Sequence, residues 1–336
     1  MVTLERLKSL IPRLGGHTVL VLGDLILDEY IIGQATRMSR EAPVPVLEFE
    51  SRRLIPGGAA NPAANITALH STAVQVGVIG PDTEATTLRQ VLQALGIETS
   101  CLVVDAARPT TLKTRLLAHM GLRFPQQVAR LDRLSRAPIS EEVERGLRAA
   151  IADQLPKVQA VLMSDYQVGL LTPSLIRTVR RLAAESGLLL AADAQGGLDK
   201  YAGFGLVKCN ADEAQAFLRR ELHGDEAFGQ AAAELFETLQ LTGAMLITRG
   251  AAGITLARAE GVVSHCPAPA VTDVYDTVGA GDTAIAVLTL AVLAGGSYEE
   301  AAQLANYASG LVVRRVGNYT PSPAELMAAL DNAEDA

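Results

Sequence analysis

The chain has 336 residues, of which 49% are hydrophobic, and its 29 basic and 37 acidic side chains give a formal net charge of −8. This composition supports a large buried core and excludes a wholly disordered chain. Aromatic residues make up only 4%, tryptophan is absent and the chain is acidic, so we expect no base-stacking surface and no binding of nucleic acid.

The N-terminal residues and the cysteines indicate the compartment. Residues 1–16 have the pattern of a short amphipathic helix and lack the apolar centre and cleavage site of a signal peptide. The longest apolar run, 284–293, is too short to span a bilayer. We therefore expect a cytoplasmic protein with no membrane association. Cys101, Cys209 and Cys266 are far apart and form no CxxC pair, which argues against disulfides and a cysteine-based zinc site.

Short apolar runs alternate along the chain with helical stretches. Such runs are typical of strands buried on both faces of a parallel sheet. The alternation predicts an α/β fold with a doubly wound, mostly parallel sheet and helices on both faces. The predicted strands are 17–23, 73–80, 160–164, 188–193 and 244–248, and the predicted helices include 84–95 and 173–186, each followed by a glycine suited to a C-terminal cap.

Two segments, roughly 30–56 and 99–131, interrupt this alternation in the first half of the chain. The first is strand-like but too rich in proline for a central strand, and the second is β-like without a clear helix. We expect the two segments to form a small β-sheet that covers a bound substrate as a lid; a pair of long surface hairpins is the alternative. Because no linker or repeat marks a second domain, residues 1–336 are expected to form a single domain.

Polar residues recur where the predicted strands end. In open α/β sheets, ligands bind at the carboxyl ends of the strands, so these residues outline one site. For Asp165 or Asp193 alone, a helix N-cap explains the residue equally well. The polar residues at this predicted edge are Asp24, Asp28, Asp165, Asp193, Asn210, Glu213, Thr248 and Arg249.

The segment 276–282, with the sequence DTVGAGD, precedes a long apolar run and has the pattern of a glycine-rich turn that opens a helix. Free amides at a helix N-terminus attract anions, and glycine lets the backbone approach a phosphate closely. A carboxylate beside that phosphate is explained if Asp282 takes the proton of a hydroxyl that attacks it. The segment therefore predicts phosphoryl transfer.

A second glycine-rich segment, 57–61, has the sequence GGAAN and precedes an alanine-rich helical run. Gly57 and Gly58 permit close approach of the backbone to a ligand, and Asn61 can both donate and accept hydrogen bonds with sugar hydroxyls. An ordinary turn with tight helix packing is the alternative for this segment alone.

Together, GGAAN near the N-terminus and DTVGAGD near the C-terminus resemble the motifs of the ribokinase (pfkB) family of carbohydrate kinases, in the family's order and over nearly the whole chain. Within the family, the first half is most similar to the heptose 7-phosphate kinases of ADP-heptose synthesis. The residues that carry this closer resemblance are GDLILDEY at 23–30, RMSREAPVPV at 37–46, TLKTR at 111–115 and QVARLD at 127–132.

The resemblance implies an ATP-dependent kinase with a ribokinase-like fold that acts on a small sugar or sugar phosphate. Asp282 would be the general base, and the backbone amides of residues 279–281, directly before it, would form the anion hole. It also implies magnesium at the Asn-x-x-Glu motif and, more loosely, a monovalent cation near Asp276. The implied residues are Gly279, Ala280 and Gly281 for the anion hole; Asp28, Gly57, Gly58 and Asn61 for the sugar; Asn210 and Glu213 for the metal and nucleotide phosphates; and Thr248, Gly250, Gly253 and Asn306 for the nucleotide.

Two departures from the heptose kinases concern positive charge. Those enzymes usually carry a lysine in the segment that corresponds to 164–169, and an Asp-Pro-Lys where this chain has Asp-Ala-Gln at 193–195. Gln167 and Gln195 supply no charge for an anionic ligand. Either other basic residues compensate, or the acceptor is not the usual phosphorylated heptose. The candidates are Lys113, Arg115, Arg123 and Arg130, of which Lys113 and Arg130 are our predicted substrate-binding residues; a solvated lid edge is the alternative for this group.

Three classes of function remain to be weighed. An ATP-dependent sugar kinase is favoured, with a heptose 7-phosphate-like acceptor preferred to ribose, fructose or a nucleoside. A non-catalytic sugar- and nucleotide-binding homologue would explain the lost lysines but not the retained Asp282. A dinucleotide-dependent oxidoreductase is disfavoured because the first predicted strand is followed by no GxGxxG. Unpaired strands at the lid edge favour a homodimer through the lid.

Overall fold

A computed structural model describes residues 2–121, 125–271 and 273–334. Its main sheet has nine strands in the order β13-β12-β11-β10-β9-β8-β1-β4-β5. The seven strands from β11 to β5 are parallel to their neighbours, whereas β12 and β13 are antiparallel. The strands are β1 Thr18–Gly23, β4 Thr72–Ile79, β5 Leu102–Val104, β8 Ala160–Asp165, β9 Leu189–Ala194, β10 Leu206–Asn210, β11 Ala244–Thr248, β12 Ile254–Arg258 and β13 Val262–Cys266.

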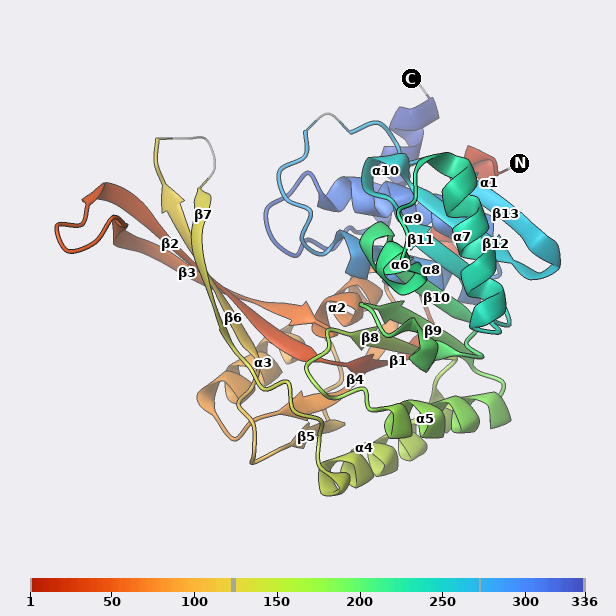
Figure 1. Cartoon of the computed structure of the whole chain (residues 1–336), viewed down its shortest axis with the longest axis horizontal. Helices are drawn as coiled ribbons and strands as arrows, with labels where there is room; N and C mark the ends of the chain where they lie inside the picture. Colours follow the sequence, from red (N-terminus) through yellow and green to blue (C-terminus); the bar gives the residue numbers. More distant parts are fainter. Residues whose placement is uncertain (1, 122–124, 272, 335–336) are drawn as a thin grey trace.

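Helices cover both faces of this sheet (Figure 1). One face packs against α1, α2, α3, α8, α9 and α10, and the other packs against α4, α5, α6 and α7. The doubly wound, mostly parallel α/β fold is therefore confirmed. The helices are α1 Leu4–Leu10, α2 Ala60–Ala68, α3 Thr83–Ala94, α4 Glu141–Gln154, α5 Pro173–Glu185, α6 Ala211–Leu218, α7 Gly224–Thr238, α8 Ala280–Leu293, α9 Tyr298–Val312 and α10 Pro323–Glu334.

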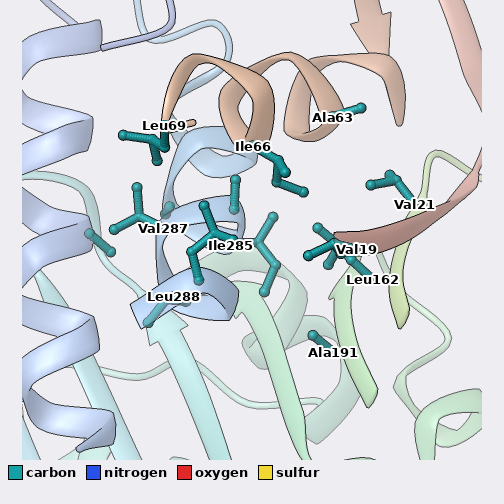
Figure 2. Close-up of a cluster of buried hydrophobic side chains, with 14 of the residues drawn as sticks. Val19, Val21, Ala63, Ile66, Leu69, Leu162, Ala191, Ile285, Val287 and Leu288 are labelled. Atoms are coloured by element: carbon teal, nitrogen blue, oxygen red, sulfur yellow. The ribbon is translucent and has the colours of Figure 1, made fainter. Parts of the chain in front are cut away.

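The core beside α8 positions the two glycine-rich segments. Helix α8 is apolar on nearly all sides, as expected of a helix enclosed by other elements. Ile285 and Leu288 of α8 lie among Ile66 of α2, Val19 of β1 and Leu162 of β8, and all five side chains are at most 1% exposed (Figure 2). Burial of side chains of this size contributes about 1.5–3 kcal/mol each. Packing of α2 on α8 therefore brings residues 57–61 next to residues 276–282.

A second, four-stranded sheet in the order β3-β2-β6-β7 projects away from the main body (Figure 1). Strand β2 pairs antiparallel with β3 and parallel with β6, and β6 pairs antiparallel with β7. We call this the lid sheet. Its edge strand β3 begins at one proline and has another near its end, in line with the proline-rich edge expected from the sequence. The strands are β2 Leu25–Met38, β3 Pro45–Gly58, β6 Leu112–His119 and β7 Gln126–Arg133.

The bounds of the lid sheet differ from the prediction. The first lid segment begins at residue 25 rather than near 30, because β2 follows β1 after a single residue. The second begins at residue 112 rather than 99, because β5 pairs with β4 at the edge of the main sheet. Strand β5 has only three residues and is followed closely by β6, so the sequence pattern did not show that the two strands belong to different sheets.

Candidate active site

The candidate site centres on the N-terminus of α8. Gly279 precedes the helix with a φ of 83°, in the left-handed region that favours glycine. A Cβ at this position would lie 2.8 Å from Nδ2 of Asn61 and 2.9 Å from Oδ1 of Asn318. In the described part of the chain, no side chain caps this helix end. The amides of Ala280 and Gly281 lie in the first turn, where the Ala280 amide makes only a long hydrogen bond of 3.4 Å to the carbonyl oxygen of Thr277, and so they suit an anion.

Asp282 lies in the first turn of α8 with only 6% of its surface exposed. Its Oδ2 accepts a hydrogen bond of 2.8 Å from Nδ2 of Asn61. The hydroxyl of Tyr166 lies 2.8 Å from Oδ1 and 3.0 Å from Oδ2 and donates to the carboxylate. The same carboxylate lines a cavity of about 540 Å³ at the carboxyl ends of the strands. Asp282 is thus oriented from two sides while it still faces a space large enough for a ligand.

A chain of buried polar groups joins α2 to α8 beneath this carboxylate. Asn65 donates from Nδ2 to the backbone oxygen of Asn61 at 3.0 Å, and Thr283 donates from its hydroxyl to Oδ1 of Asn65 at 2.9 Å. All three side chains are fully buried. Because buried polar groups need partners, this network fixes the place of Asn61 relative to Asp282. The sequence indicated Asn61 but not the network that holds it.

The surroundings of Asp282 raise its pKa to about 7. Burial is the largest cause, because it penalises the charged carboxylate, and the nearby charge of Asp193 adds to it. The hydrogen bonds from Asn61 and Tyr166 and the charge of Lys208 oppose the increase. A carboxylate whose pKa lies near neutral pH accepts a proton more readily than an ordinary aspartate, which suits a general base.

Lys208 of β10 is a site residue that the sequence analysis missed. Its Nζ lies 2.7 Å from Oδ1 of Asp193 and 3.4 Å from the carbonyl oxygen of Gly281. Burial alone would lower the pKa of this lysine, but the charges of Asp193 and Asp282 raise it above the ordinary value, so Lys208 is a cation. The available signal was a lysine inside the apolar strand 206–209, since buried lysines require a partner.

The predicted sugar-binding residues gather on the other side of Asp282. Asp28 of β2 accepts hydrogen bonds from Arg115 at Oδ1 and from Asn318 at Oδ2. A Cβ on Gly57 would lie 2.2 Å from Oδ2 of Asp28, which explains glycine there. Gly58 has a φ of 57°, again in the left-handed region. Asn318 was missed by the sequence analysis, because it lies 290 residues from Asp28 and no local pattern connects the two.

Lys113 and Arg130, the two predicted substrate-binding residues of the lid sheet, differ in their partners. Nζ of Lys113 lies 5.3 Å from the ring centroid of Tyr166, and burial lowers the pKa of this lysine. Among the described residues, no ion pair is found for Lys113. Arg130, by contrast, pairs with Asp132 of its own strand at 2.9 Å and is half exposed. Arg123 lies outside the described residues. Lys113 is therefore a lid cation that lies near the ring of Tyr166 and for which no ion pair is found among the described residues.

Cations do stand near the two glutamines that replace the expected lysines. Lys200, in the 3₁₀ turn Leu198–Tyr201, has its Nζ 2.8 Å from Oδ2 of Asp165. The backbone amide of Gln167 donates to Oδ1 of the same aspartate. Gln195 lines the 540 Å³ cavity together with Lys208. Positive charge therefore reaches this edge from residues that lie elsewhere in the sequence.

An apolar cavity of about 380 Å³ adjoins the first cavity, and Thr277 and Gly281 line both. All four predicted nucleotide-binding residues line it: Thr248, Gly250, Gly253 and Asn306. Gly253 has a φ of 84°, and a Cβ there would lie 2.1 Å from the carbonyl oxygen of Cys266. Nδ2 of Asn306 donates to the same carbonyl at 2.7 Å. These contacts hold the cavity wall, and an apolar slot beside a polar cavity suits a planar base followed by phosphates.

Asn210 and Glu213 form a capping box at the start of α6. The side chain of Asn210 accepts from the amide of Glu213 at 2.9 Å, and the Glu213 carboxylate accepts from the amide of Asn210. Both residues line the 540 Å³ cavity, and burial raises the pKa of Glu213. In the described ranges, no cluster of three or more His, Cys, Asp or Glu side chains could hold a metal. One carboxylate and one amide oxygen fit magnesium that also binds phosphates and water.

Asp276 orders the segment that leads into α8. Its Oδ1 accepts from the amide of Val278 at 3.0 Å, and its Oδ2 accepts from the amide of Gly317 at 2.9 Å. Asp276 therefore ties the glycine-rich turn to the segment that carries Asn318.

Comparison with known families places these observations in context. A family model described as pfkB family carbohydrate kinase matches residues 17–325. The bifunctional protein HldE of Hyphomonas neptunium is 38% identical over 331 residues, which cover 98% of this chain and 66% of that protein. HldE of Caulobacter vibrioides is 40% identical over 327 residues, 96% of this chain and 66% of that protein. The chain thus spans 66% of the length of these two curated relatives.

Solved structures show the same fold at low sequence identity. Phosphofructokinase-2 from Escherichia coli, in complex with substrates and products, has a TM-score of 0.76 at 19% identity, covering 95% of this chain and 99% of its own. Arabidopsis thaliana ribokinase, complexed with ribose and ATP, has a TM-score of 0.72 at 19% identity, covering 94% and 99%. The fold is therefore ribokinase-like. No helix within the described ranges is long and apolar enough to cross a membrane.

Proposed function

Because the chain belongs to the pfkB family of carbohydrate kinases, we propose that it transfers the γ-phosphoryl group of ATP to a hydroxyl of a sugar or sugar phosphate. One observation carries this proposal. The buried carboxylate of Asp282 lies at an uncapped helix N-terminus beside two adjoining cavities, and it is hydrogen-bonded to Tyr166, whose ring Lys113 of the lid sheet approaches. This arrangement supplies a base, an anion site and two ligand spaces in contact with each other.

In the proposed reaction, Asp282 accepts the proton of the acceptor hydroxyl. The hydroxyl oxygen forms a bond to the γ-phosphorus while the bond from that phosphorus to the β,γ-bridging oxygen breaks, and ADP carries away the electron pair. Loose phosphoryl-transfer transition states need positioning and charge stabilisation more than a strong base, so an aspartate suffices. The amides of Gly279, Ala280 and Gly281 would stabilise the negative charge on the transferring group.

The nucleotide would lie across the two adjoining cavities. Its base would occupy the apolar cavity beside Asn306, and its phosphates would extend past Thr248 and Gly250, which line both cavities. Asn210 and Glu213 would hold Mg²⁺ directly or through water, and the metal would neutralise charge on the phosphates. Lys208 would add a fixed positive charge beside Asp193 on the same side.

The acceptor that the site supports best is a phosphorylated heptose. The resemblance of residues 23–30 and 111–115 to heptose 7-phosphate kinases supports it, as does the identity to HldE proteins. Asp28, Gly57, Gly58 and Asn61 would bind the sugar. Lys113 would pair with the acceptor phosphate, because it is a half-buried cation for which no ion pair is found among the described residues. Arg130 would contribute only if it leaves Asp132.

Three further properties belong to this proposal. A monovalent cation near Asp276 is suggested by the resemblance and by the fold neighbour solved in complex with potassium. The lid sheet has two edge strands, β3 and β7, whose unpaired backbone groups favour a homodimer through the lid. The absence of a membrane-spanning helix from the described residues agrees with a cytoplasmic enzyme that binds small molecules.

The decisive experiment is a kinetic screen of acceptors with ATP and magnesium. Release of ADP should be stimulated by a heptose 7-phosphate more than by ribose, fructose, fructose 6-phosphate or a nucleoside, each measured as kcat/KM. A preference for one of the other sugars would keep the kinase and reject this acceptor. Binding of a sugar without any stimulated ADP release would instead favour a non-catalytic homologue and overturn the kinase.

A further inference from the structure

Tyr166 donates a hydrogen bond directly to the carboxylate of Asp282, the candidate base. Of the site residues predicted from the sequence, Asn61 also does so. Tyr166 follows β8 immediately, and its hydroxyl is within 3.0 Å of both carboxylate oxygens of Asp282. A phenolic O–H carries a single proton, so it is shared between the two oxygens, with the shorter contact of 2.8 Å to Oδ1. Asn61 supplies a second donor, but to Oδ2 alone.

The backbone and the ring of Tyr166 are each held in place. The backbone amide donates to Oδ2 of Asp24 at 2.9 Å, and the amides of Val168 and Leu170 donate to the same carboxylate. On the lid side, Nζ of Lys113 lies 5.3 Å from the ring centroid, a distance at which a cation is attracted to an aromatic face. The position of the hydroxyl is therefore determined by the main sheet and by the lid together.

We propose that Tyr166 is a positioning residue that orients the Asp282 carboxylate for proton transfer, an inference that rests on the proposed kinase function. Asn61 donates to Oδ2, and the single Tyr166 proton is shared between the two oxygens with the shorter contact to Oδ1. Each carboxylate oxygen has about two acceptor sites, so two donors leave lone pairs for the acceptor hydroxyl. Tyr166 and Asn61 together oppose rotation of the carboxylate and leave it able to take the proton of the acceptor hydroxyl.

The electrostatic setting agrees with a donor role for the phenol. Burial raises the pKa of Tyr166 well above its ordinary value, and the charge of Asp282 acts in the same direction, so the phenol keeps its proton. Its hydrogen bond favours the charged form of Asp282. The other charged groups that act on this pair are Asp193 of β9, Lys208 of β10 and Asp28 of the lid sheet.

The test is Tyr166→Phe, which removes the hydroxyl and keeps the ring under Lys113. The acid limb of the kcat profile should move up by about half a pH unit or more, because the charged form of Asp282 loses a donor. At pH 7, kcat should fall about 10-fold or more, with KM for ATP within about threefold of the wild-type value. Thermal unfolding and ATP binding, measured on the same sample, report whether the variant folds.

Tyr201→Phe is the matched control. Tyr201 is buried and donates its hydroxyl to a carboxylate, Asp165, at 2.7 Å, but among the described residues it forms no hydrogen bond with Asp282. Its loss should lower the melting temperature and leave the acid limb in place. An unshifted acid limb in folded, ATP-binding Tyr166→Phe, or an equal shift in Tyr201→Phe, would overturn the inference. A wild-type protein with no kinase activity toward any acceptor would instead overturn the proposed function.

Discussion

The main sheet and the lid sheet bury their strands to very different degrees. Every residue of β8 is buried, whereas β7 of the lid sheet is exposed along almost its whole length. The main sheet has helices on both faces, and the lid sheet projects from it (Figure 1). Parallel strands covered on both faces are necessarily apolar, whereas a projecting sheet tolerates charge. The main sheet therefore suits the rigid placement of site residues, and the lid sheet suits charged side chains that contact a ligand.

The two sheets also differ in the groups that they bring to the site. The main sheet and α8 contribute backbone amides, glycines and deeply buried side chains such as Asp282 and Lys208. The lid sheet contributes the charged side chains of Asp28, Lys113 and Arg115. We infer that the main body determines the phosphoryl donor and the reaction, and that the lid determines the acceptor. If this division holds, changes in the main body will alter turnover, and changes in the lid sheet will alter the use of the acceptor.

The largest effect is expected for Asp282→Asn, which removes the base and keeps the shape. Because general base catalysis contributes about 10²–10⁴-fold, kcat should fall by that factor. KM for ATP should stay within about threefold, since Asp282 does not line the apolar cavity proposed for the adenine. Steady-state kinetics with the best acceptor measure both constants. Asp153→Asn, an exposed residue of α4, is the control; turnover of Asp282→Asn within a few-fold of wild type would remove Asp282 from the role of base.

A loss of about 10²-fold in kcat is expected for Gly279→Ala, because misplaced groups at a reacting centre cost that much. The added Cβ would crowd Asn61 and Asn318. Gly96→Ala is the matched control, since Gly96 has a φ of 73° and no atom within 4 Å of the added Cβ. Both variants should lose about 1 kcal/mol of stability from the left-handed backbone. Equal activity of the two variants, measured beside their unfolding free energies, would contradict the assignment.

Lys113→Met tests the lid side of the comparison. For a phosphorylated acceptor, kcat/KM should fall about 10- to 100-fold, because a charge-assisted contact is lost without a large change in shape. KM for ATP should not change, and an unphosphorylated sugar should be affected much less. Lys157→Met, an exposed residue after α4, is the control. An equal loss with phosphorylated and unphosphorylated sugars would show that Lys113 does not read the phosphate.

The smallest effect concerns stability. In the folded protein the pKa of Asp282 is raised from 3.8 to about 7, so between these values the folded state binds a proton that the unfolded state does not. Wild-type stability therefore gains from this group as the pH falls through that window, and loses the gain above pH 7. The stability of Asp282→Asn relative to wild type should therefore be greater at pH 8 than at pH 5, by on the order of 2 kcal/mol. Denaturant unfolding at both pH values checks this, and an equal difference at both would contradict the raised pKa.

Sequence patterns predicted the main sheet more accurately than the lid sheet. The predicted strand 244–248 coincides with β11, and 160–164 differs from β8 by one residue. These strands are buried on both faces, so their apolar runs have sharp ends. The lid strands have a mixed pattern, because one face is solvated, and their bounds were wrong by five residues at the start of the first segment and by 13 at the start of the second.

The amino-acid sequence by itself determined the order of the elements and the two glycine-rich motifs, because hydrophobic period and glycine requirements are local properties. It also indicated Asp282, whose place in the first turn of α8 follows from its own motif. Only the tertiary structure decided what surrounds that carboxylate. Tyr166, Lys208 and Asn318 reach the site from separate elements, and no local pattern marks a residue whose partner is distant in sequence. The raised pKa of Asp282 has the same origin, since burial and neighbouring charge exist only in the folded chain.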